Sequence, residues 1–476
     1  MRADDLHEGA WTPVALGRRR PTPDAADGPP GVADPARKTV GIVSLGCPKN
    51  LVDSEVMLGH LRSQGYEVAA DAGDADVIVV NTCAFVDGAK KESVDAILEM
   101  ARHKESGRAQ RLVVTGCLSQ RYDAELRAEI PEIDATLGTG QIDEIVAAVS
   151  GVATVTDAET GPPTWIYGSE SPRLLSTPSW LAYLKISEGC DYTCSFCIIP
   201  TLRGKHRSRS ADDIVAEATR LAEQGVRELV LVAQDSTRWG LDQGLRGGLA
   251  TLLHRLGAID GLRWIRVMYA YPSTVTDEIL DAIASEPKVV NYIDIPLQHA
   301  SDAVLRRMKR PTGRGHLLGL VERMRERVPN LTLRTTFIVG FPGETESDFQ
   351  ELLEFVKTAE FDHVGVFAYS DEEGTSAYDL DEKVPRVVQS ARRRKLMALQ
   401  KRIASRRNRG RVGKHVEVLV EGVHPETDFL LQGRLAGQAP EVDGNVLIAD
   451  GTAAPGAFVT CEITEAHPYD LVARIV

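Results

Sequence analysis

The stretch LAYLKISEGCDYTCSFCIIPTLRG, residues 181–204, decides how the rest of the chain is interpreted. Its first six residues form an apolar run typical of a buried β-strand. The loop that follows holds Cys190, Cys194 and Cys197 within eight positions. Gly189 and Asp191 favour turns in this loop, so the three thiols can converge on one centre.

Three thiols without a fourth ligand nearby favour an iron–sulfur cluster over zinc. A structural zinc is normally closed by a fourth Cys or His, and His206 lies nine residues beyond Cys197, which is not a usual zinc spacing. Ligation by three thiolates suits a cubane cluster with one iron left open for a substrate or cofactor. A structural zinc, or a chance grouping of cysteines, is the alternative.

Five further strand-like runs follow, each with a helical pattern after it apart from local loops. Together with the first run, the candidate strands are residues 181–186, 227–233, 264–270, 289–295, 331–340 and 362–369. Strands that alternate with helices predict a parallel sheet with right-handed crossovers. Six such units predict a (β/α)6 partial barrel rather than a closed barrel of eight.

The same alternation precedes the opening stretch, and three more cysteines fall on it. Candidate strands 39–46, 75–82 and 111–116 are followed by candidate helices 50–64, 85–103 and 119–128. Cys47, Cys83 and Cys117 each come at or just past a strand end, and such positions gather at one edge of a parallel sheet. The helix starts should also favour the thiolate, which is the form that binds metal. The alternative for each is an ordinary buried cysteine.

The chain ends in a different kind of structure. Residues 391–411 predict a basic helix, and Leu396, Met397, Leu399 and Ile403 recur at near-helical spacing, so we expect it to pack on the barrel. Beyond Val412 the pattern changes to short strands divided by Gly, Pro and Asp turns, which predicts a small all-β barrel of OB type. Cys461 lies in one of these strands and is expected only to pack.

The charge of this C-terminal module bears on its partners. From Val412 onward three basic and ten acidic residues give a net charge of 3 − 10 = −7. Such a surface should repel phosphate and attract a basic protein. The alternative is that the acidic residues only keep the module soluble.

The length and net charge of the chain narrow the possible domain organisation and the class of protein. At 476 residues the chain predicts several domains, and its net charge of −13 argues against a general nucleic-acid binder. No apolar run is long enough for a membrane span or a secretory signal, so we expect a cytoplasmic protein. The predicted organisation is a disordered tail (1–37), an α/β domain (38–150), a linker (151–178), the partial barrel (179–409) and the β module (410–476).

A C-x3-C-x2-C loop after the first strand of a partial barrel resembles the radical S-adenosylmethionine superfamily. The resemblance implies a [4Fe-4S] cluster on Cys190, Cys194 and Cys197, with S-adenosylmethionine on the open iron as the source of a 5′-deoxyadenosyl radical. It also implies that Phe196 lies against this cofactor. FIVGFPGE, residues 337–344, is similar to the superfamily's fifth-strand glycine motif. Gln234, Gln298 and Arg334 are expected at strand ends, where each is a cofactor contact or an ordinary structural residue.

The whole arrangement from Thr39 to Val476 resembles the methylthiotransferases of this superfamily. That resemblance implies a second [4Fe-4S] cluster on Cys47, Cys83 and Cys117, and two molecules of S-adenosylmethionine, one as methyl donor and one as radical source. GCPKN at 46–50 lacks the Gln-Met pair of the tRNA-modifying branch and is similar to the RimO branch. The substrate of that branch is the β-carbon of an aspartate in the twelfth protein of the small ribosomal subunit.

The implied partners are therefore the ribosomal protein, through the acidic module, and an electron donor that the residues leave unidentified. The basic helix over 391–411 could also contact ribosomal RNA. Two alternatives remain open at this point. One is a tRNA adenosine methylthiotransferase, and the other is an iron–sulfur protein that binds ribosomes without chemistry.

Overall fold

The computed structural model describes residues 14–15, 38–151 and 162–476, which form two units. The N-terminal unit runs up to Ser176 and includes Ser187–Thr193 and Cys197–Arg209. The C-terminal unit consists of Thr177–Ile186, Cys194–Phe196 and Ser210–Val476. The predicted disordered tail, apart from Val14 and Ala15, and residues 152–161 of the predicted linker lie outside the described residues.

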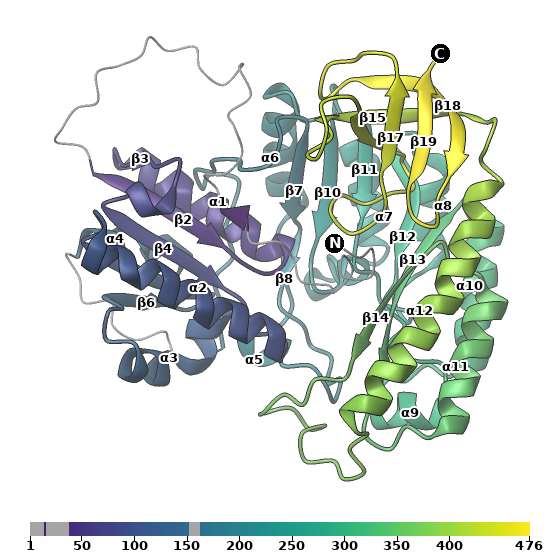
Figure 1. Cartoon of the computed structure of the whole chain (residues 1–476), viewed down its shortest axis with the longest axis horizontal. Helices are drawn as coiled ribbons and strands as arrows, with labels where there is room; N and C mark the ends of the chain where they lie inside the picture. Colours follow the sequence, from purple (N-terminus) through teal and green to yellow (C-terminus); the bar gives the residue numbers. More distant parts are fainter. Residues whose placement is uncertain (1–13, 16–37, 152–161) are drawn as a thin grey trace. The chain divides into compact units, whose positions relative to one another are not determined.

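The N-terminal unit is built on one mostly parallel sheet in the order β1-β2-β4-β5-β6, with β3 beside β2 (Figure 1). Only β1 runs antiparallel to its neighbour. The strands are β1 (Val14–Ala15), β2 (Thr39–Ser44), β3 (Glu67–Val68), β4 (Val77–Thr82), β5 (Arg111–Gly116) and β6 (Ala135–Leu137). The helices are α1 (Pro48–Ser63), α2 (Asp87–Ser106), α3 (Cys117–Glu129) and α4 (Ile145–Ser150).

The sequence explains why this sheet is enclosed. β4 reads VIVVNT and every one of its residues is buried, as expected for a parallel strand that is covered on both faces. One face packs on α2 and α3 through a core that includes Val80, Val114, Ile97 and Leu118. The predicted strands and helices of this unit are confirmed, and the structure adds β3, β6 and α4.

The C-terminal unit contains a second sheet of six parallel strands in the order β14-β13-β12-β11-β10-β7. Its strands are β7 (Leu181–Lys185), β10 (Glu228–Val232), β11 (Trp264–Val267), β12 (Val289–Asp294), β13 (Thr332–Val339) and β14 (His363–Ala368). The helices that follow them are α6 (Ala211–Glu223), α7 (Gly248–Gly257), α8 (Asp277–Ser285), α9 (Asp302–Arg307), α10 (Arg314–Arg327), α11 (Glu346–Ala359) and α12 (Arg386–Arg409). This open sheet confirms the predicted partial barrel.

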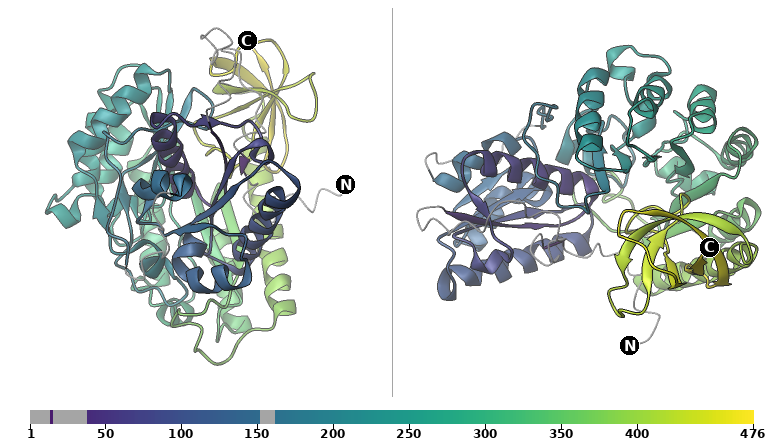
Figure 2. Two further views of the ribbon diagram at one scale, coloured as in Figure 1. Left: turned by 90° about the vertical axis from the view of Figure 1, so that its left-hand side faces the viewer. Right: turned by 90° about the horizontal axis from the view of Figure 1, so that it is seen from above.

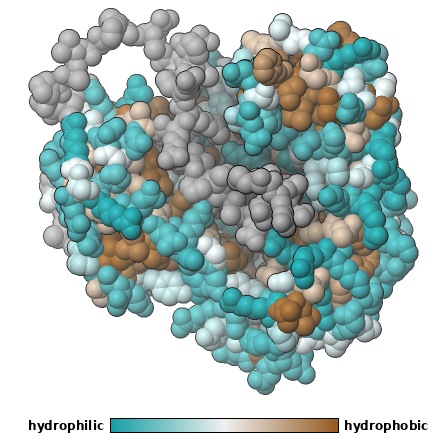
Figure 3. All heavy atoms as spheres, in the orientation of Figure 1, coloured by the Kyte–Doolittle hydropathy of each residue, from teal (hydrophilic) through white to brown (hydrophobic). Residues whose placement is uncertain are grey.

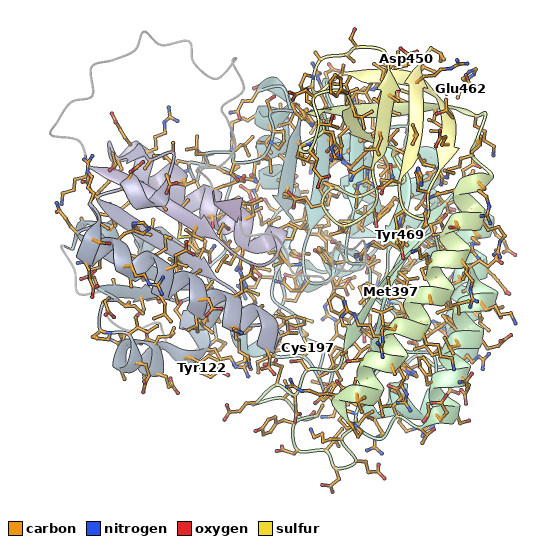
Figure 4. All side chains as sticks on the ribbon, in the orientation of Figure 1. Tyr122, Cys197, Met397, Asp450, Glu462 and Tyr469 are labelled. Carbon is orange, nitrogen blue, oxygen red and sulfur yellow. The ribbon has the colours of Figure 1, made fainter. Side chains whose placement is uncertain are left out.

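Local signals place the helix starts. Ser210 caps α6 by accepting a hydrogen bond from the backbone N–H of Asp213. Thr345 and Asp348 form a reciprocal capping box at the start of α11. On α12, Leu396 and Ile403 are buried while Met397, labelled in Figure 4, is half-buried, so the helix packs on its unit as predicted.

The chain ends in a closed five-stranded barrel, which belongs to the C-terminal unit (Figure 2). Its strands are β15 (His415–Val423), β16 (Leu431–Arg434), β17 (Val446–Asp450), β18 (Phe458–Ala466) and β19 (Leu471–Ile475). The predicted β module is confirmed, although the sequence pattern missed β19, which closes the barrel between β17 and β18. Cys461 is fully buried in the barrel core, where the sequence placed it as a packing residue.

The face drawn in Figure 3 is largely hydrophilic, with its hydrophobic side chains in separate patches. Of the helices that the structure describes, none combines the length and the apolar character that a membrane span requires.

Candidate iron–sulfur sites and their surroundings

The three N-terminal cysteines lie at the carboxyl ends of three neighbouring strands. Cys47 is the N-cap of α1 and makes no side-chain capping bond, Cys83 directly follows β4, and Cys117 begins α3 after β5. Because β2, β4 and β5 are adjacent and parallel, these positions share one edge of the sheet. The predicted gathering of these cysteines at one edge is therefore confirmed.

Close packing brings the loops of these cysteines together. Gly46 has a φ of +83°, and a Cβ on it would lie 2.7 Å from Cβ and 3.0 Å from Sγ of Cys83. Only glycine fits this close approach at a positive φ without strain. Among the described residues, no three Cys, His, Asp or Glu side chains are grouped closely enough to hold a single metal ion.

Burial is the largest influence on the pKa of two of these thiols, Cys83 and Cys117. Burial raises the pKa of Cys83 well above its usual range, and the nearby Cys117 and Cys47 raise it further. Burial also raises the pKa of Cys117, while the Arg203 guanidinium opposes that shift. At Cys83 and Cys117, burial therefore opposes the thiolate form that the helix starts are expected to favour, because desolvation disfavours a charge.

Asn50 joins the three cysteine loops. Its amide nitrogen donates to the carbonyl oxygens of Leu45 (3.0 Å) and Thr82 (2.8 Å), which come just before Cys47 and Cys83. Its Oδ1 lies 3.8 Å from Sγ of Cys117. Asn50 is fully buried, so each bond is worth more than it would be at the surface. The sequence marked Asn50 only as a helix start.

A hydroxyl group fixes the middle loop. Oγ of Ser93, on α2, accepts from the backbone N–H of Cys83 and donates to its carbonyl oxygen, both at 2.9 Å. The loop therefore holds its shape without help from the thiol, which stays available as a ligand. Three thiols on loops that are held by hydrogen bonds to their backbone fit the thiolate-only ligation of an iron–sulfur cluster.

The opening stretch of the sequence forms a turn closed by its own backbone. Cys190 donates its backbone N–H to Gly204 O at 3.0 Å, and β8 (Ser187–Glu188) pairs with β9 (Arg207–Ser208). Gly189 has a φ of +84°, and a Cβ there would lie 2.1 Å from Lys205 O. At this positive φ and close approach only glycine fits without strain.

The three cysteines of this stretch are half-buried and divide between the two units. Cys190 and Cys197 belong to the N-terminal unit, and Cys194 belongs to the C-terminal unit. Figure 4 labels Cys197. Joint ligation of one cluster by all three therefore remains a prediction from their spacing. His206 is buried, and its Nε2 lies 3.2 Å from Ser208 Oγ.

A cationic side chain lies beside Cys194. Nη1 of Arg310 is 4.0 Å from Cys194 Sγ, and its Nη2 donates to Pro296 O at 2.7 Å. The guanidinium also stacks over the ring of Tyr271 at 4.2 Å. Burial raises the pKa of Tyr271 to about 12, so its hydroxyl stays protonated. Sequence reasoning missed Arg310 and Tyr271, because neither stands near a cysteine along the chain.

The predicted cofactor contacts lie in different surroundings. Phe196 packs against a cluster that includes Met308, Phe341 and Tyr369. Gln234 is half-buried in the loop after β10. Gln298 has a φ of +72°, and its backbone bonds to Thr336 and Ile338 extend the pairing with β13 beyond the end of β12. Both glutamines therefore follow strand ends, as predicted.

Arg334 is placed differently from the prediction. It is the third residue of β13, near the amino end of that strand rather than its carboxyl end. Its Nη1 donates to Asp294 at 3.0 Å, and its Nε lies 3.4 Å from Asp443, which comes from the β module. The candidate strand 331–340 already places Arg334 near its amino end, so the expectation that it lies at the carboxyl end of the strand is wrong.

The glycine motif at 337–344 is held by its own glutamate. Glu344 accepts the backbone N–H groups of Gly340 and Phe341, and Nη1 of Arg392 on α12 donates to it at 3.0 Å. Burial raises the pKa of Glu344 to about 7, although Arg392 and the two N–H groups oppose the shift. Gly340 has a φ of +75°, and a Cβ there would meet Gln389 at 2.3 Å. The motif therefore fixes the loop after β13 against α12.

Part of the acidity of the β module is neutralised within the C-terminal unit. Glu417 pairs with Arg263 and Glu462 with Arg474, both at 2.6 Å, and the side chain of Asp443 is only 1% exposed. Asp450 and Glu465 remain exposed. Asp450 and Glu462, which Figure 4 labels, lie on β17 and β18. Arg474 is already counted in the net charge of −7, so of these two pairs only that of Glu417 with Arg263 brings a positive charge from outside the module.

Three known families match successive parts of the chain. Residues 39–138 match the family described as "Uncharacterized protein family UPF0004", residues 184–356 match the radical SAM superfamily, and residues 412–476 match the TRAM domain. Among solved structures, the chain resembles the radical S-adenosylmethionine methyltransferase TsrM from Kitasatospora setae, with a TM-score of 0.52 and 16% identity. That likeness covers 70% of this chain and 72% of that one, and at this identity it supports the fold alone.

Curated relatives cover almost the entire chain. A protein from Myxococcus xanthus is 56% identical over 92% of this chain and 92% of its own length, and one from Koribacter versatilis is 50% identical over 92% and 96%. Both bear the name "Ribosomal protein uS12 methylthiotransferase RimO", as does a 51% identical protein from Trichlorobacter lovleyi. With this identity and coverage, the chain belongs to the RimO family and is a radical SAM methylthiotransferase.

Proposed function

We propose that the chain methylthiolates the β-carbon of an aspartate in ribosomal protein uS12, using two [4Fe-4S] clusters and two molecules of S-adenosylmethionine. The observation that carries the proposal is the 50–56% identity, over more than nine-tenths of the chain, to proteins named for uS12 methylthiotransfer. The six cysteines supply the donor set that two clusters of three thiolates each would need.

In this proposal Cys47, Cys83 and Cys117 hold the cluster at which sulfur is prepared for transfer. Asn50 and Ser93 keep the loops of these thiols in place through bonds to backbone groups beside them. Binding the cluster releases the protons that burial otherwise keeps on Cys83 and Cys117. The chain therefore contributes a fixed, water-poor set of donors.

Cys190, Cys194 and Cys197 would hold the second cluster, with Phe196, Gln234 and Gln298 as the proposed contacts of S-adenosylmethionine. When bound, this cluster supplies the electron that makes a radical able to remove hydrogen from an unactivated carbon, which no protein base could deprotonate. Arg310 places a positive charge beside Cys194 and balances part of the negative charge of the thiolates.

We propose that uS12 approaches through the acidic β module, because ribosomal proteins are basic. Ribosomal RNA beside the substrate could contact α12, where a groove is lined in part by Lys401, Arg402, Arg406 and Arg409. We propose that the reaction takes place in the cytoplasm and that it needs an electron donor, which the residues leave unidentified. The domain limits expected from the sequence are part of the same proposal.

The test uses anaerobically reconstituted protein with reductant, S-adenosylmethionine and either uS12 or tRNA. The expected result is that one aspartate of uS12 exchanges a hydrogen for a methylthio group, as measured by mass spectrometry. Modification of adenosine in tRNA with unchanged uS12 would instead identify the tRNA enzyme. If S-adenosylmethionine does not alter the electron paramagnetic resonance signal of the cluster, the chain is a binding protein without chemistry.

A further inference from the structure

A buried arginine from the opening stretch reaches the N-terminal cysteines. Arg203 is the last residue of α5 (Ile199–Arg203), six positions after Cys197, and is 3% exposed. Ile198, just before this short helix, and Leu202, within it, pack in the same core as Cys117 and Leu118. Oγ1 of Thr139 also donates to Leu202 O at 2.6 Å. The segment after Cys197 is thus built into the N-terminal unit.

The contacts of Arg203 converge on the cysteine loops. Its Nη1 lies 2.6 Å from Asp53 and 3.2 Å from Glu188, and its Nη2 donates to Oδ1 of Asn50. That oxygen is the atom that lies 3.8 Å from Cys117 Sγ. Arg203 therefore fixes the orientation of the amide whose nitrogen holds the loops of Cys47 and Cys83.

We propose that Arg203 is a positioning residue of the N-terminal cluster and that its guanidinium makes this cluster easier to reduce. The proposal rests on the proposed function, in which Cys47, Cys83 and Cys117 hold a cluster. A permanent positive charge near thiolates stabilises added negative charge, and burial strengthens that interaction. The guanidinium contacts Oδ1 of Asn50, and that oxygen lies 3.8 Å from Cys117 Sγ, so the positive charge stands close to a proposed ligand.

The alternative is that Arg203 only neutralises Asp53 and Glu188. In that case its removal would lower stability, because two buried carboxylates would lose their partner, but it would not change the cluster itself. The reduction potential of the cluster separates the two roles, since a purely structural ion pair does not set it.

The experiment uses the full-length chain with Cys194→Ala, so that only the N-terminal cluster is complete. Iron and sulfide content, the paramagnetic resonance spectrum and a redox titration are measured for Arg203→Met, Arg203→Lys and the unchanged Arg203. The control is Arg207→Met, because Arg207 lies in the same segment and donates to the carbonyl oxygens of Arg203, Lys205 and Trp165. Thermal unfolding records any loss of stability.

We expect Arg203→Met to lower the ratio of reduced to oxidised cluster at least about tenfold at a fixed applied potential. For a one-electron couple, this means that the reduction potential of the cluster becomes more negative by about 59 mV. Arg203→Lys should recover most of this shift, and Arg207→Met should show none. An unshifted potential in Arg203→Met with full iron content would overturn the proposal. So would an equal shift in Arg207→Met.

A second variant covers the case in which Arg203→Met does not fold or bind iron. Asp53→Asn removes a carboxylate that Arg203 faces, so it should shift the potential in the opposite direction. A loaded Asp53→Asn protein with an unchanged potential also overturns the proposal. If the Cys194→Ala protein with Arg203 intact binds no iron, the proposed N-terminal cluster itself is wrong, and this inference is overturned with it.

Discussion

The two groups of three cysteines reach their places by different physical means. Cys190, Cys194 and Cys197 are neighbours along the chain, so one loop can present them, and all three are half-buried. Cys47, Cys83 and Cys117 are separated by 36 and 34 residues (83 − 47 and 117 − 83), and a sheet edge must gather them. The first group therefore depends on local sequence, whereas the second depends on the packing of a whole domain.

The difference also appears in the surroundings of the thiols. The N-terminal thiols have a buried network of Asn50, Ser93 and Arg203 around them, while Cys194 has Arg310 and Tyr271 on one side. A fixed network preserves a site when its metal is absent. We therefore expect the N-terminal site to keep its structure and its iron when the other proposed cluster is lost.

The largest effect is expected from removing one ligand of each group. Cys194→Ala should abolish cleavage of S-adenosylmethionine and remove about half of the bound iron, because only one of the two proposed clusters loses a ligand. Cys83→Ala should remove a similar share of iron but leave reductive cleavage of S-adenosylmethionine in place. Iron analysis and the yield of 5′-deoxyadenosine measure both. Loss of both clusters in either variant would show that the two groups are not independent.

A large loss of stability is expected from Glu228→Gln in the C-terminal unit. Glu228 is fully buried and accepts from Arg434 at 2.6 Å and from Arg266 at 3.0 Å. Its replacement removes the carboxylate that Arg266 and Arg434 share and leaves Arg434 with Glu421 alone, which costs about 3–5 kcal/mol. Denaturant unfolding measures the loss. The matched control is Glu417→Gln, whose exposed pair with Arg263 should cost less than about 1 kcal/mol.

The carboxylate of Glu228 also predicts that the free energy of unfolding depends on pH. Burial alone would raise the pKa of Glu228, but Arg434 and Arg266 together lower it below its ordinary value of 4.5. A carboxyl group with a lowered pKa in the folded state stabilises the protein above about pH 4.5, and that contribution is lost as the pH falls further. The free energy of unfolding, measured between pH 6 and pH 3, should therefore fall more steeply with decreasing pH for the parent than for Glu228→Gln. Parallel curves would contradict this assignment.

An intermediate effect is expected from Asn50→Ala. The change removes two buried bonds to Leu45 O and Thr82 O and leaves both carbonyl groups without that donor, at a cost of about 2–4 kcal/mol. The N-terminal cluster should load less completely, while the signal of the other cluster is unchanged. Iron content and resonance spectra, recorded in the Cys194→Ala and Cys83→Ala backgrounds, distinguish the N-terminal cluster from the other cluster. Full N-terminal loading would show that the amide does not hold these loops.

The smallest effect is expected from Cys461→Ala, the cysteine control. Its sulfur is fully buried in the barrel core, and loss of that contact should cost about 1 kcal/mol without changing iron content. Thermal unfolding measures the loss of stability, and iron analysis measures the iron content. A loss of iron would mean that a seventh cysteine takes part in cluster binding.

The order of the main strands and helices, and the position of each cysteine along them, could be predicted from the sequence, although β3, β6, α4 and β19 were missed. Runs such as VIVVNT and RLVVTG carry their own strand signal, and parallel strands must end at a common edge, so the gathering of Cys47, Cys83 and Cys117 follows from local patterns. The spacing of Cys190, Cys194 and Cys197 is equally local. These features depend on residues that are close along the chain.

Only the tertiary structure decided which distant side chains surround the sites. Arg203 meets Asp53 across 150 positions, Arg434 meets Glu228 across 206, and Arg334 meets Asp443 from another module. The strand β19 closes its barrel by pairing with β17 and β18. No local pattern marks these partners, because a buried charge is stabilised by whichever opposite charge packing brings to it, and that choice is made by the assembled core.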